Sequence, residues 1–287
     1  MPEIFDTTRC GLGEGPLWHP TRGQLFWFDI VGHRLHTQEK GKTRTLQFDE
    51  HVSAAGWVDD ATLLIASETR LFLLNLETEK REDVEGLEAS DATTRSNDGR
   101  ADPWGGFWIG TMAKQNARNG EGAIYRYYRG ALRKMFPGIS IPNAICFSPD
   151  RKHAYFADTP TRKIMRVRLE ADFGWPEGNP EVFLDLTEEG LWPDGAVTDA
   201  EGNLWNAQWG AWRVACYAPD GTFLREVRVD AAHSSCPAFG GADLSTLFCT
   251  TALQALSVED KAASAHNGMT FAAPETGRGV PEYRVRL

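Results

Sequence analysis

The amino-acid sequence predicts an all-β fold, a six-bladed β-propeller that takes up residues 1–287 as a single domain. Three observations support this prediction: short strand-like runs recur along the chain, their turn-rich lead-ins repeat every 39 to 51 residues, and helical periodicity is scarce. A period of about 40 to 50 residues with several strands per repeat is typical of propeller blades. Solenoids of similar period are helical, and the strand-like runs exclude them.

The composition agrees with short strands joined by many turns. The 287 residues are 41% hydrophobic and 24% charged, and they include 28 Gly, 15 Pro and 10 Trp. The net charge of −10 and the lack of a basic cluster argue against nucleic acid as a partner. No cationic N-terminal segment precedes an apolar run, and no 18 consecutive residues are apolar, so we expect a cytoplasmic protein without a membrane partner.

The five cysteines are odd in number, widely spaced, and include no C-x-x-C pair. This pattern indicates neither a disulfide framework nor a structural zinc site. We therefore expect Cys10, Cys146, Cys216, Cys236 and Cys249 to be small buried side chains.

Each of the six repeats contains a strand-like run that follows a turn rich in Gly, Asp or Asn. We expect these strands at Leu25–Ile30, Leu63–Ala66, Phe107–Gly110, Ala154–Asp158, Leu204–Ala207 and Leu247–Thr251. In the first five repeats a second run follows after a short loop, at His33–Thr37, Leu71–Leu74, Ala123–Tyr127, Ile164–Val167 and Arg213–Tyr217.

The sixth repeat becomes irregular after Thr251. We expect Met269–Ala272 and Tyr283–Leu287 to supply its further strands. We also expect the N-terminal residues to pair into this blade, because a closed ring usually completes one blade with both termini. Ser257–Ala263 is the best amphipathic segment, and its short length leaves open whether it forms a helical turn.

Six polar residues share one place in the repeat. Counting six residues back from the aligned turn position gives Glu14, Ser53, Asn97, Asn143, Asp194 and Ser235. In a propeller this place lies at the start of the innermost strand of each blade, so we expect the six side chains to converge on the rim of the central channel.

Three of these rim residues carry oxygen donors suited to a divalent cation: Glu14, Asn143 and Asp194. Two carboxylates and one amide nearly neutralise such an ion and leave positions for water and substrate. None of the seven His residues occupies a rim position, which argues against a closed zinc site. The pattern predicts one exchangeable divalent metal ion and leaves its identity open among Ca, Zn, Mn, Fe and Mg.

A simpler interpretation has to be weighed against the metal site. Asp and Asn before turns often cap the backbone and bind nothing. Their common place in the repeat and their Pro or Gly neighbours, which fix the backbone, favour the metal site.

Arg95 lies two residues before Asn97, so in a strand both side chains point to the same side. A guanidinium and an amide there could hold the hydroxyls or the carboxylate of a polyol-like ligand, or Arg95 could only balance a rim carboxylate. Four tryptophans near the fifth repeat could wall a sugar-binding cleft or pack between blades: Trp175, Trp192, Trp209 and Trp212.

Five segments together resemble the senescence marker protein 30, gluconolactonase and regucalcin family of six-bladed propellers, in order along nearly the whole chain. They are LGEGPLWHP, RSNDGRADPWGGFWIGTM, IPNAICFSPD, PDGAVTDAEGNLW and CPAFGGADLSTLFCTTA. The resemblance implies one divalent metal ion on the propeller axis, held by Glu14, Asn143 and Asp194. It also implies substrate contacts by Arg95 and Asn97. Where mammalian members place a Glu that contacts the sugar, this chain has Gln115, so its sugar preference can differ.

The function implied by this resemblance is a metal-dependent hydrolase, a gluconolactonase-like sugar lactonase of carbohydrate catabolism. Its small-molecule partner would be an aldono-1,4- or 1,5-lactone, which it would open to the aldonic acid with the metal as a Lewis acid. Asp194 is the expected general base, and direct activation of the attacking water by the metal is the alternative. We expect a monomer or a weak homo-oligomer.

Two other functions remain open at this point. One is a calcium-binding, regulatory propeller without turnover, which would not need the polyol contacts of Arg95 and Asn97. The other is hydrolysis of aryl esters or phosphotriesters on the same metal, for which we expect a more apolar pocket.

Overall fold

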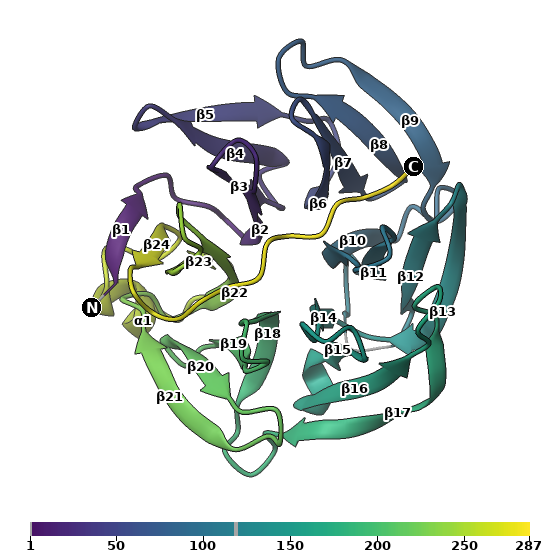
Figure 1. Ribbon diagram of the computed structural model, residues 1–287. Helices are drawn as coiled ribbons and strands as arrows, with labels where there is room; N and C mark the ends of the chain where they lie inside the picture. The colour runs from purple at the N-terminus through teal and green to yellow at the C-terminus, as the bar shows by residue number, and fades with distance from the viewer. Residues whose placement is uncertain (1, 118–119) are drawn as a thin grey trace.

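The computed structural model describes residues 2–117 and 120–287 as a closed ring of six four-stranded antiparallel sheets (Figure 1). Consecutive strands pair with one another in every sheet, except that one sheet also pairs the first strand of the chain with the last, and the sheets are arranged around a central axis as blades (Figure 1). The six innermost strands contact their neighbours around the whole ring. The predicted six-bladed β-propeller is therefore confirmed.

Blades 1 to 3 each consist of four consecutive strands, given from the channel outward. Blade 1 contains β2 (Gly13–His19), β3 (Gln24–Asp29), β4 (Arg34–Glu39) and β5 (Lys42–Gln47). Blade 2 contains β6 (Val52–Asp59), β7 (Thr62–Ser67), β8 (Arg70–Asn75) and β9 (Arg81–Gly86). Blade 3 contains β10 (Thr94–Ala101), β11 (Phe107–Ala113), β12 (Gly122–Tyr128) and β13 (Ala131–Ile139).

Blades 4 and 5 follow the same order. Blade 4 contains β14 (Pro142–Phe147), β15 (His153–Asp158), β16 (Lys163–Leu169) and β17 (Pro176–Asp185), with the 3₁₀ turn η1 (Thr159–Thr161) after β15. Blade 5 contains β18 (Trp192–Thr198), β19 (Leu204–Trp209), β20 (Arg213–Tyr217) and β21 (Phe223–Arg228). Every expected strand of the first five repeats lies in or largely overlaps one of these strands.

Blade 6 closes the ring with strands from both ends of the chain. From the channel outward it contains β22 (Ser234–Gly240), β23 (Thr246–Thr251), β24 (Thr270–Ala273) and β1 (Glu3–Asp6). Glu3 of β1 pairs with Ala272 of β24 in antiparallel register, so the expected role of the N-terminus is confirmed. The segment Ser257–Ala263 forms a short helix, α1 (Val258–Ala263), with the Ser257 side chain accepting a hydrogen bond from the Asp260 amide as its N-cap.

The hydrophobic core lies between neighbouring blades. Phe28 and Leu35 of blade 1, for example, pack in one cluster with Ile65 and Phe72 of blade 2, and all four are at most 1% exposed. Burying each such side chain contributes about 1.5–3 kcal/mol to the stability of the fold. The outermost strands of the blades are more exposed than the inner ones. All five cysteines are buried and unpaired. None of the described helices is long and apolar enough to cross a membrane.

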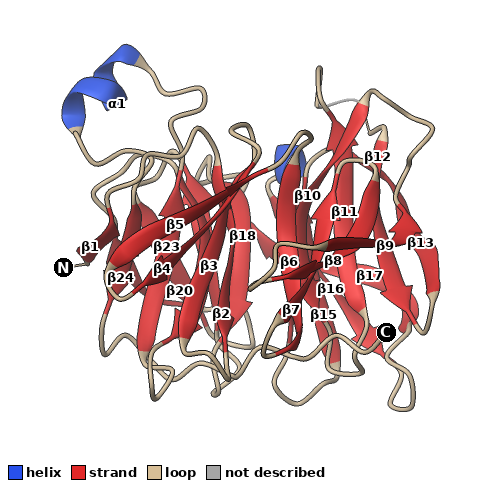
Figure 2. Ribbon diagram, turned by 90° about the horizontal axis from the view of Figure 1, so that it is seen from above, coloured by secondary structure: helices blue, strands red, loops and turns tan. Residues whose placement is uncertain are grey.

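The C-terminal segment differs from the prediction, because Tyr283–Leu287 forms no strand. Instead it crosses the face of the ring opposite to α1 (Figures 1 and 2). The Val285 amide donates to the Trp57 carbonyl at 2.9 Å, and the Arg286 amide donates to the Gly105 carbonyl at 2.8 Å. Trp57 lies near the end of β6 that is farther from Ser53, and Gly105 lies in the turn that joins β10 to β11, so the segment covers the lower end of the channel. We call the face that carries η1 and α1 the upper face.

Candidate active site

A cavity of about 380 Å³ lies at the upper end of the channel. Five of its lining residues come from the innermost strands of four different blades: Glu14, Arg95, Asn97, Asn143 and Asp194. Four of these five are rim residues of the sequence repeat, and all five are buried. The structure thus brings together the three oxygen donors and both polyol-binding candidates that were expected from the sequence.

The other two rim residues brace neighbouring strands. Ser53 Oγ donates to Ser96 Oγ at 2.8 Å, and Ser235 Oγ donates to the carbonyl oxygen of Gly13, next to Glu14. These two serines therefore support the cavity indirectly, because they hold in place the strands that carry Asn97 and Glu14.

Every innermost strand has a break in register beside its rim residue. The break follows Glu14 in β2 and Asn143 in β14, and it begins at Pro193, directly before Asp194, in β18. A β-bulge of this kind bends the strand and redirects a side chain, which explains how residues on six separate strands point to one axis.

The glycines that follow the two carboxylates are required by the adjacent blade. Gly15 has a positive φ of 52°, and a Cβ there would lie 2.3 Å from the Ser53 carbonyl oxygen. A Cβ on Gly195 would lie 2.3 Å from the sulfur of Cys236. Both strands therefore approach the next blade more closely than any side chain would allow.

Arg95, Asn97 and Asn143 form a hydrogen-bonded row. Arg95 Nη1 donates to Asn97 Oδ1 at 2.9 Å and to the Ser96 carbonyl at 2.8 Å. Asn97 Nδ2 donates to Asn143 Oδ1 and to the Pro142 carbonyl, both at 3.0 Å. The two amides are thus held in fixed orientations beside the carboxylates.

The cavity carries an excess of buried carboxyl groups. Burial, together with the charge of Asp98, raises the pKa of Glu14, and burial together with the charge of Glu14 raises the pKa of Asp194 well above its usual range. Burial also raises the pKa of Asp98 to about 6, although its carboxylate accepts a hydrogen bond from the Ile145 amide at 2.8 Å. A dication would relieve this crowding and restore both ligand carboxyls to the ionised state, so the donor set fits a divalent metal ion.

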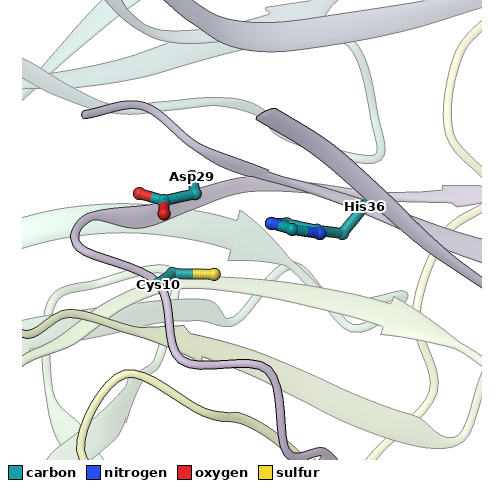
Figure 3. Close-up of side chains that lie close together, drawn as sticks. All are labelled: Cys10, Asp29 and His36. Atoms are coloured by element: carbon teal, nitrogen blue, oxygen red, sulfur yellow. The ribbon is translucent and has the colours of Figure 1, made fainter. Parts of the chain in front are cut away.

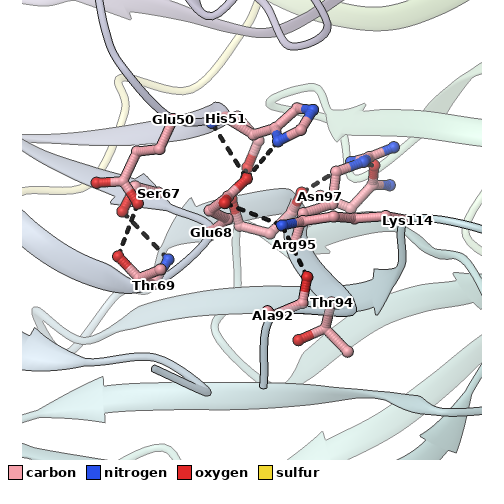
Figure 4. Close-up of polar contacts among 12 residues, drawn as sticks. Glu50, His51, Ser67, Glu68, Thr69, Ala92, Thr94, Arg95, Asn97 and Lys114 are labelled. Atoms are coloured by element: carbon pink, nitrogen blue, oxygen red, sulfur yellow. Dashed lines mark hydrogen bonds and ion pairs between the residues drawn. The ribbon is translucent and has the colours of Figure 1, made fainter. Parts of the chain in front are cut away.

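Arg95 remains the cation of the cavity. Burial lowers the pKa of Arg95 to about 10, against the opposing charges of Glu14 and Glu68, so it is protonated at neutral pH. Glu68 is already engaged by the His51 imidazole and by Lys114 Nζ, the latter at 2.9 Å (Figure 4). Within the described part of the chain, Arg95 itself is held by a carbonyl and an amide oxygen, not by a rim carboxylate.

Two tryptophans form an aromatic wall of the cavity. Trp192 and Trp209 are cross-strand partners in blade 5, and both line the cavity. Trp209 stacks on His233 at 4.0 Å, and the Arg162 guanidinium lies 4.3 Å from the Trp192 ring centre. Trp175, in contrast, lies against Arg126 at 4.5 Å and does not line the cavity. Trp192 and Trp209 therefore line the cavity, whereas Trp175 packs between blades 3 and 4.

Sequence reasoning missed the residues at which second strands return to the upper face. Met112, Thr159 and Gln254 lie at or just after the ends of β11, β15 and β23, and all three line the cavity. Antiparallel pairing brings the end of each second strand back to the rim, so the repeat alignment could have pointed to them.

Gln115 lies in the exposed loop after β11 and is not among the lining residues.

A second group of potential ligands lies inside blade 1, outside the cavity. One donor atom each of Cys10, Asp29 and His36 lie within 4.8 Å of one another (Figure 3). Asp29 Oδ1 accepts hydrogen bonds from the amides of Leu12, at 3.0 Å, and Gly32, at 3.2 Å. Burial raises the pKa of the Cys10 thiol and lowers the pKa of His36, so both stay neutral. These contacts anchor the segment that leads to Glu14.

Comparison with known proteins gives consistent matches over the whole propeller. The sequence model of the SMP-30/Gluconolactonase/LRE-like region matches residues 12–253. The 6-deoxy-6-sulfogluconolactonase of Pseudomonas putida is 34% identical over 275 residues, 94% of each chain. The L-arabinolactonase of Azospirillum brasilense is 34% identical over 288 residues, 98% of this chain and 94% of its own. The crystal structure of a calcium-binding protein, regucalcin from Agrobacterium tumefaciens, superposes with a TM-score of 0.97 at 39% identity, covering 100% of this chain and 98% of its own.

Proposed function

The chain belongs to the SMP-30/gluconolactonase/LRE-like family, and from this premise we propose that it is a metal-dependent sugar lactonase. Its substrate would be an aldono-1,4- or 1,5-lactone, opened to the aldonic acid in carbohydrate catabolism. The observation that supports the proposal is the cavity itself, which combines two buried carboxyl groups, a hydrogen-bonded Arg95–Asn97 pair and an aromatic wall.

Glu14, Asn143 and Asp194 would hold one divalent metal ion, whose identity the donor set leaves open. Carboxylate and amide oxygens suit hard cations such as Ca²⁺ and Mg²⁺ and are also accepted by Mn²⁺, Fe²⁺ and Zn²⁺. When bound, such an ion supplies Lewis-acid polarisation of the lactone carbonyl.

Arg95 and Asn97 would bind the hydroxyl groups of the lactone. Asn97 Nδ2 already donates two hydrogen bonds, so only its Oδ1 can accept one more, from a substrate hydroxyl. Arg95 uses Nη1 for Asn97 and Ser96, and among the described residues its other N–H groups donate no hydrogen bond, so they could donate to substrate hydroxyls. The pair therefore offers both an acceptor and donors, as recognition of a polyol requires.

Trp192 and Trp209 would pack against the apolar face of the sugar ring. Gln115 would contact the substrate only from the outer loop, so we expect it to tune the sugar preference rather than the reaction.

Asp194 would act as the general base. It takes a proton from the water whose oxygen bonds to the lactone carbonyl carbon. The bond between that carbon and the ring oxygen then breaks, and Asp194 returns the proton to the ring oxygen, which leaves as a hydroxyl group. Its burial leaves the carboxyl group poorly solvated, and its place in the cavity lining would put it near the carbonyl of a lactone bound there.

A panel of sugar lactones in a pH-indicator assay tests the proposal. The protein is stripped with a chelator and then supplied with Ca²⁺, Mn²⁺, Fe²⁺, Zn²⁺ or Mg²⁺ in turn. We expect at least one aldonolactone to open only when metal is restored. Metal binding without any lactone opening would support the calcium-binding, regulatory alternative, and turnover of aryl esters alone would support the esterase alternative.

A further inference from the structure

Thr159 extends the hydrogen-bonded row of the cavity across two blades. Asn143 Nδ2 donates to Thr159 Oγ1 at 2.8 Å, and Thr159 Oγ1 donates to the carbonyl oxygen of Pro193 at 2.7 Å. Pro193 directly precedes Asp194. The row thus runs from Arg95 in blade 3 through Asn143 and Thr159 in blade 4 to the backbone of blade 5.

The two ends of the row determine which way each amide faces. Arg95 can only donate, so the Asn97 atom beside it must be Oδ1, and Nδ2 of Asn97 then faces Asn143. The Pro193 carbonyl can only accept, so the single hydroxyl hydrogen of Thr159 points to it. Toward Asn143, Thr159 is therefore an acceptor, and the Asn143 atom beside it must be Nδ2. Both ends independently require Asn143 Oδ1 to lie on the side of Asn97.

The Thr159 hydroxyl is itself held in a fixed place. It lies at the start of η1, its amide donates to the Ile141 carbonyl at 3.0 Å, and the residue is 9% exposed. A β-branched side chain on an anchored backbone has few rotamers, so the hydroxyl costs little further entropy to position.

We propose that Thr159 is a positioning residue for the metal site. It holds the Asn143 amide with its oxygen available as a ligand and ties the same hydroxyl to the backbone that carries Asp194. The inference rests on the proposed function in one respect, namely that Asn143 Oδ1 binds the metal ion. Some residues do not touch the metal but hydrogen-bond to a side chain that binds it. Removing such a residue usually weakens metal affinity by about 10- to 100-fold.

Titration of the stripped, full-length protein with Ca²⁺ and with Mn²⁺ by calorimetry tests this role without any lactone. We expect Thr159→Val, which keeps the shape and removes the hydroxyl, to raise the Kd of the metal by about 10-fold or more. We expect Thr159→Ser, which keeps the hydroxyl, to stay within about 3-fold of the wild type.

Thr161→Val is the matched control, because the Thr161 hydroxyl lies in the same turn but donates to the Asp158 carbonyl and is exposed. A wild-type metal Kd for Thr159→Val overturns the proposal, and so does an equal loss in both Val variants. If Thr159→Val does not fold, Thr159→Ala takes its place with the same two overturning results. If the wild type binds no metal, this result would instead refute both the metal-dependent function and the role of Thr159.

Discussion

The two ends of the central channel bury charged groups in opposite ways. At the upper end, Glu14 and Asp194 line one cavity, where burial raises both pKa values, helped by the charge of Asp98 for Glu14 and by the charge of Glu14 for Asp194. At the lower end, Arg100 and Glu282 form an ion pair whose side chains are 10% and 7% exposed. A buried charge without a partner destabilises a fold, whereas a paired one is tolerated. The buried carboxyl groups of the upper end therefore suit a positively charged ligand, whereas the buried charges of the lower end already neutralise each other.

The largest expected effect is the loss of activity in Asp194→Asn. Replacing the carboxylate removes the charge of a proposed metal ligand and also the proposed base, so lactone opening should fall by about 10³-fold or more, equivalent to about 4 kcal/mol of barrier. The stability of the chelated protein should not fall, because a like-charge repulsion disappears. Steady-state kinetics and thermal melting in chelator measure the two effects. Unfolding of this variant would assign Asp194 to structure instead.

At the lower end, Glu282→Gln should have the opposite outcome. The substitution leaves the buried Arg100 guanidinium without its counter-charge, and breaking such a pair costs about 3 kcal/mol of unfolding free energy. The kcat/KM of the folded variant should stay within about 3-fold of the wild type. Urea unfolding and lactone kinetics check this, with Arg100→Met/Glu282→Leu as a control that should recover part of the stability. If Glu282→Gln instead lost most of its activity and kept its stability, the lower end would serve the reaction rather than the fold, which would contradict this comparison.

The smallest expected effect concerns pH. A carboxyl group whose pKa is higher in the folded than in the unfolded protein stabilises the fold below its ordinary pKa and loses that contribution as pH rises. For Glu14 the loss begins above 4.5, its ordinary value, and continues up to its raised pKa. The chelated protein should therefore lose up to about 1.4 kcal/mol per pH unit in this range.

Two comparisons check the origin of this pH dependence. Glu14→Gln should flatten the curve of unfolding free energy against pH, and saturating metal should flatten it in the wild type. A slope that persists in Glu14→Gln would place its origin elsewhere in the molecule.

The repeat in the sequence was sufficient to predict the blades and the rim residues, because both depend on local turn chemistry and on a common place in each repeat. Glu14, Asn143 and Asp194 line one cavity although they are far apart along the chain. Tyr283–Leu287 was wrongly predicted as a strand, because its backbone partners Trp57 and Gly105 belong to other blades. No repeat pattern carries that information.

The roles of Thr159 and Gln115 were also out of reach of the sequence. The Thr159 hydroxyl matters through a carbonyl in the next blade, and that neighbour is set by the packing of sheets rather than by spacing. Gln115 is assigned only by its resemblance to a family position, and the structure shows it as an exposed residue after β11.

Closure of the ring by β1 and β24 also sets the order in which the site can be assembled during synthesis. Glu14 is made 180 residues before Asp194, and β22 of blade 6 contacts both β2 and β18, the strands that carry them. Blade 6 is complete only when residues 3–6 pair with residues 270–273. A growing chain that has not reached this point cannot bring the two carboxylates together. The proposed metal site would therefore form only when the whole ring is complete, and shorter fragments of the chain should bind no metal at this place.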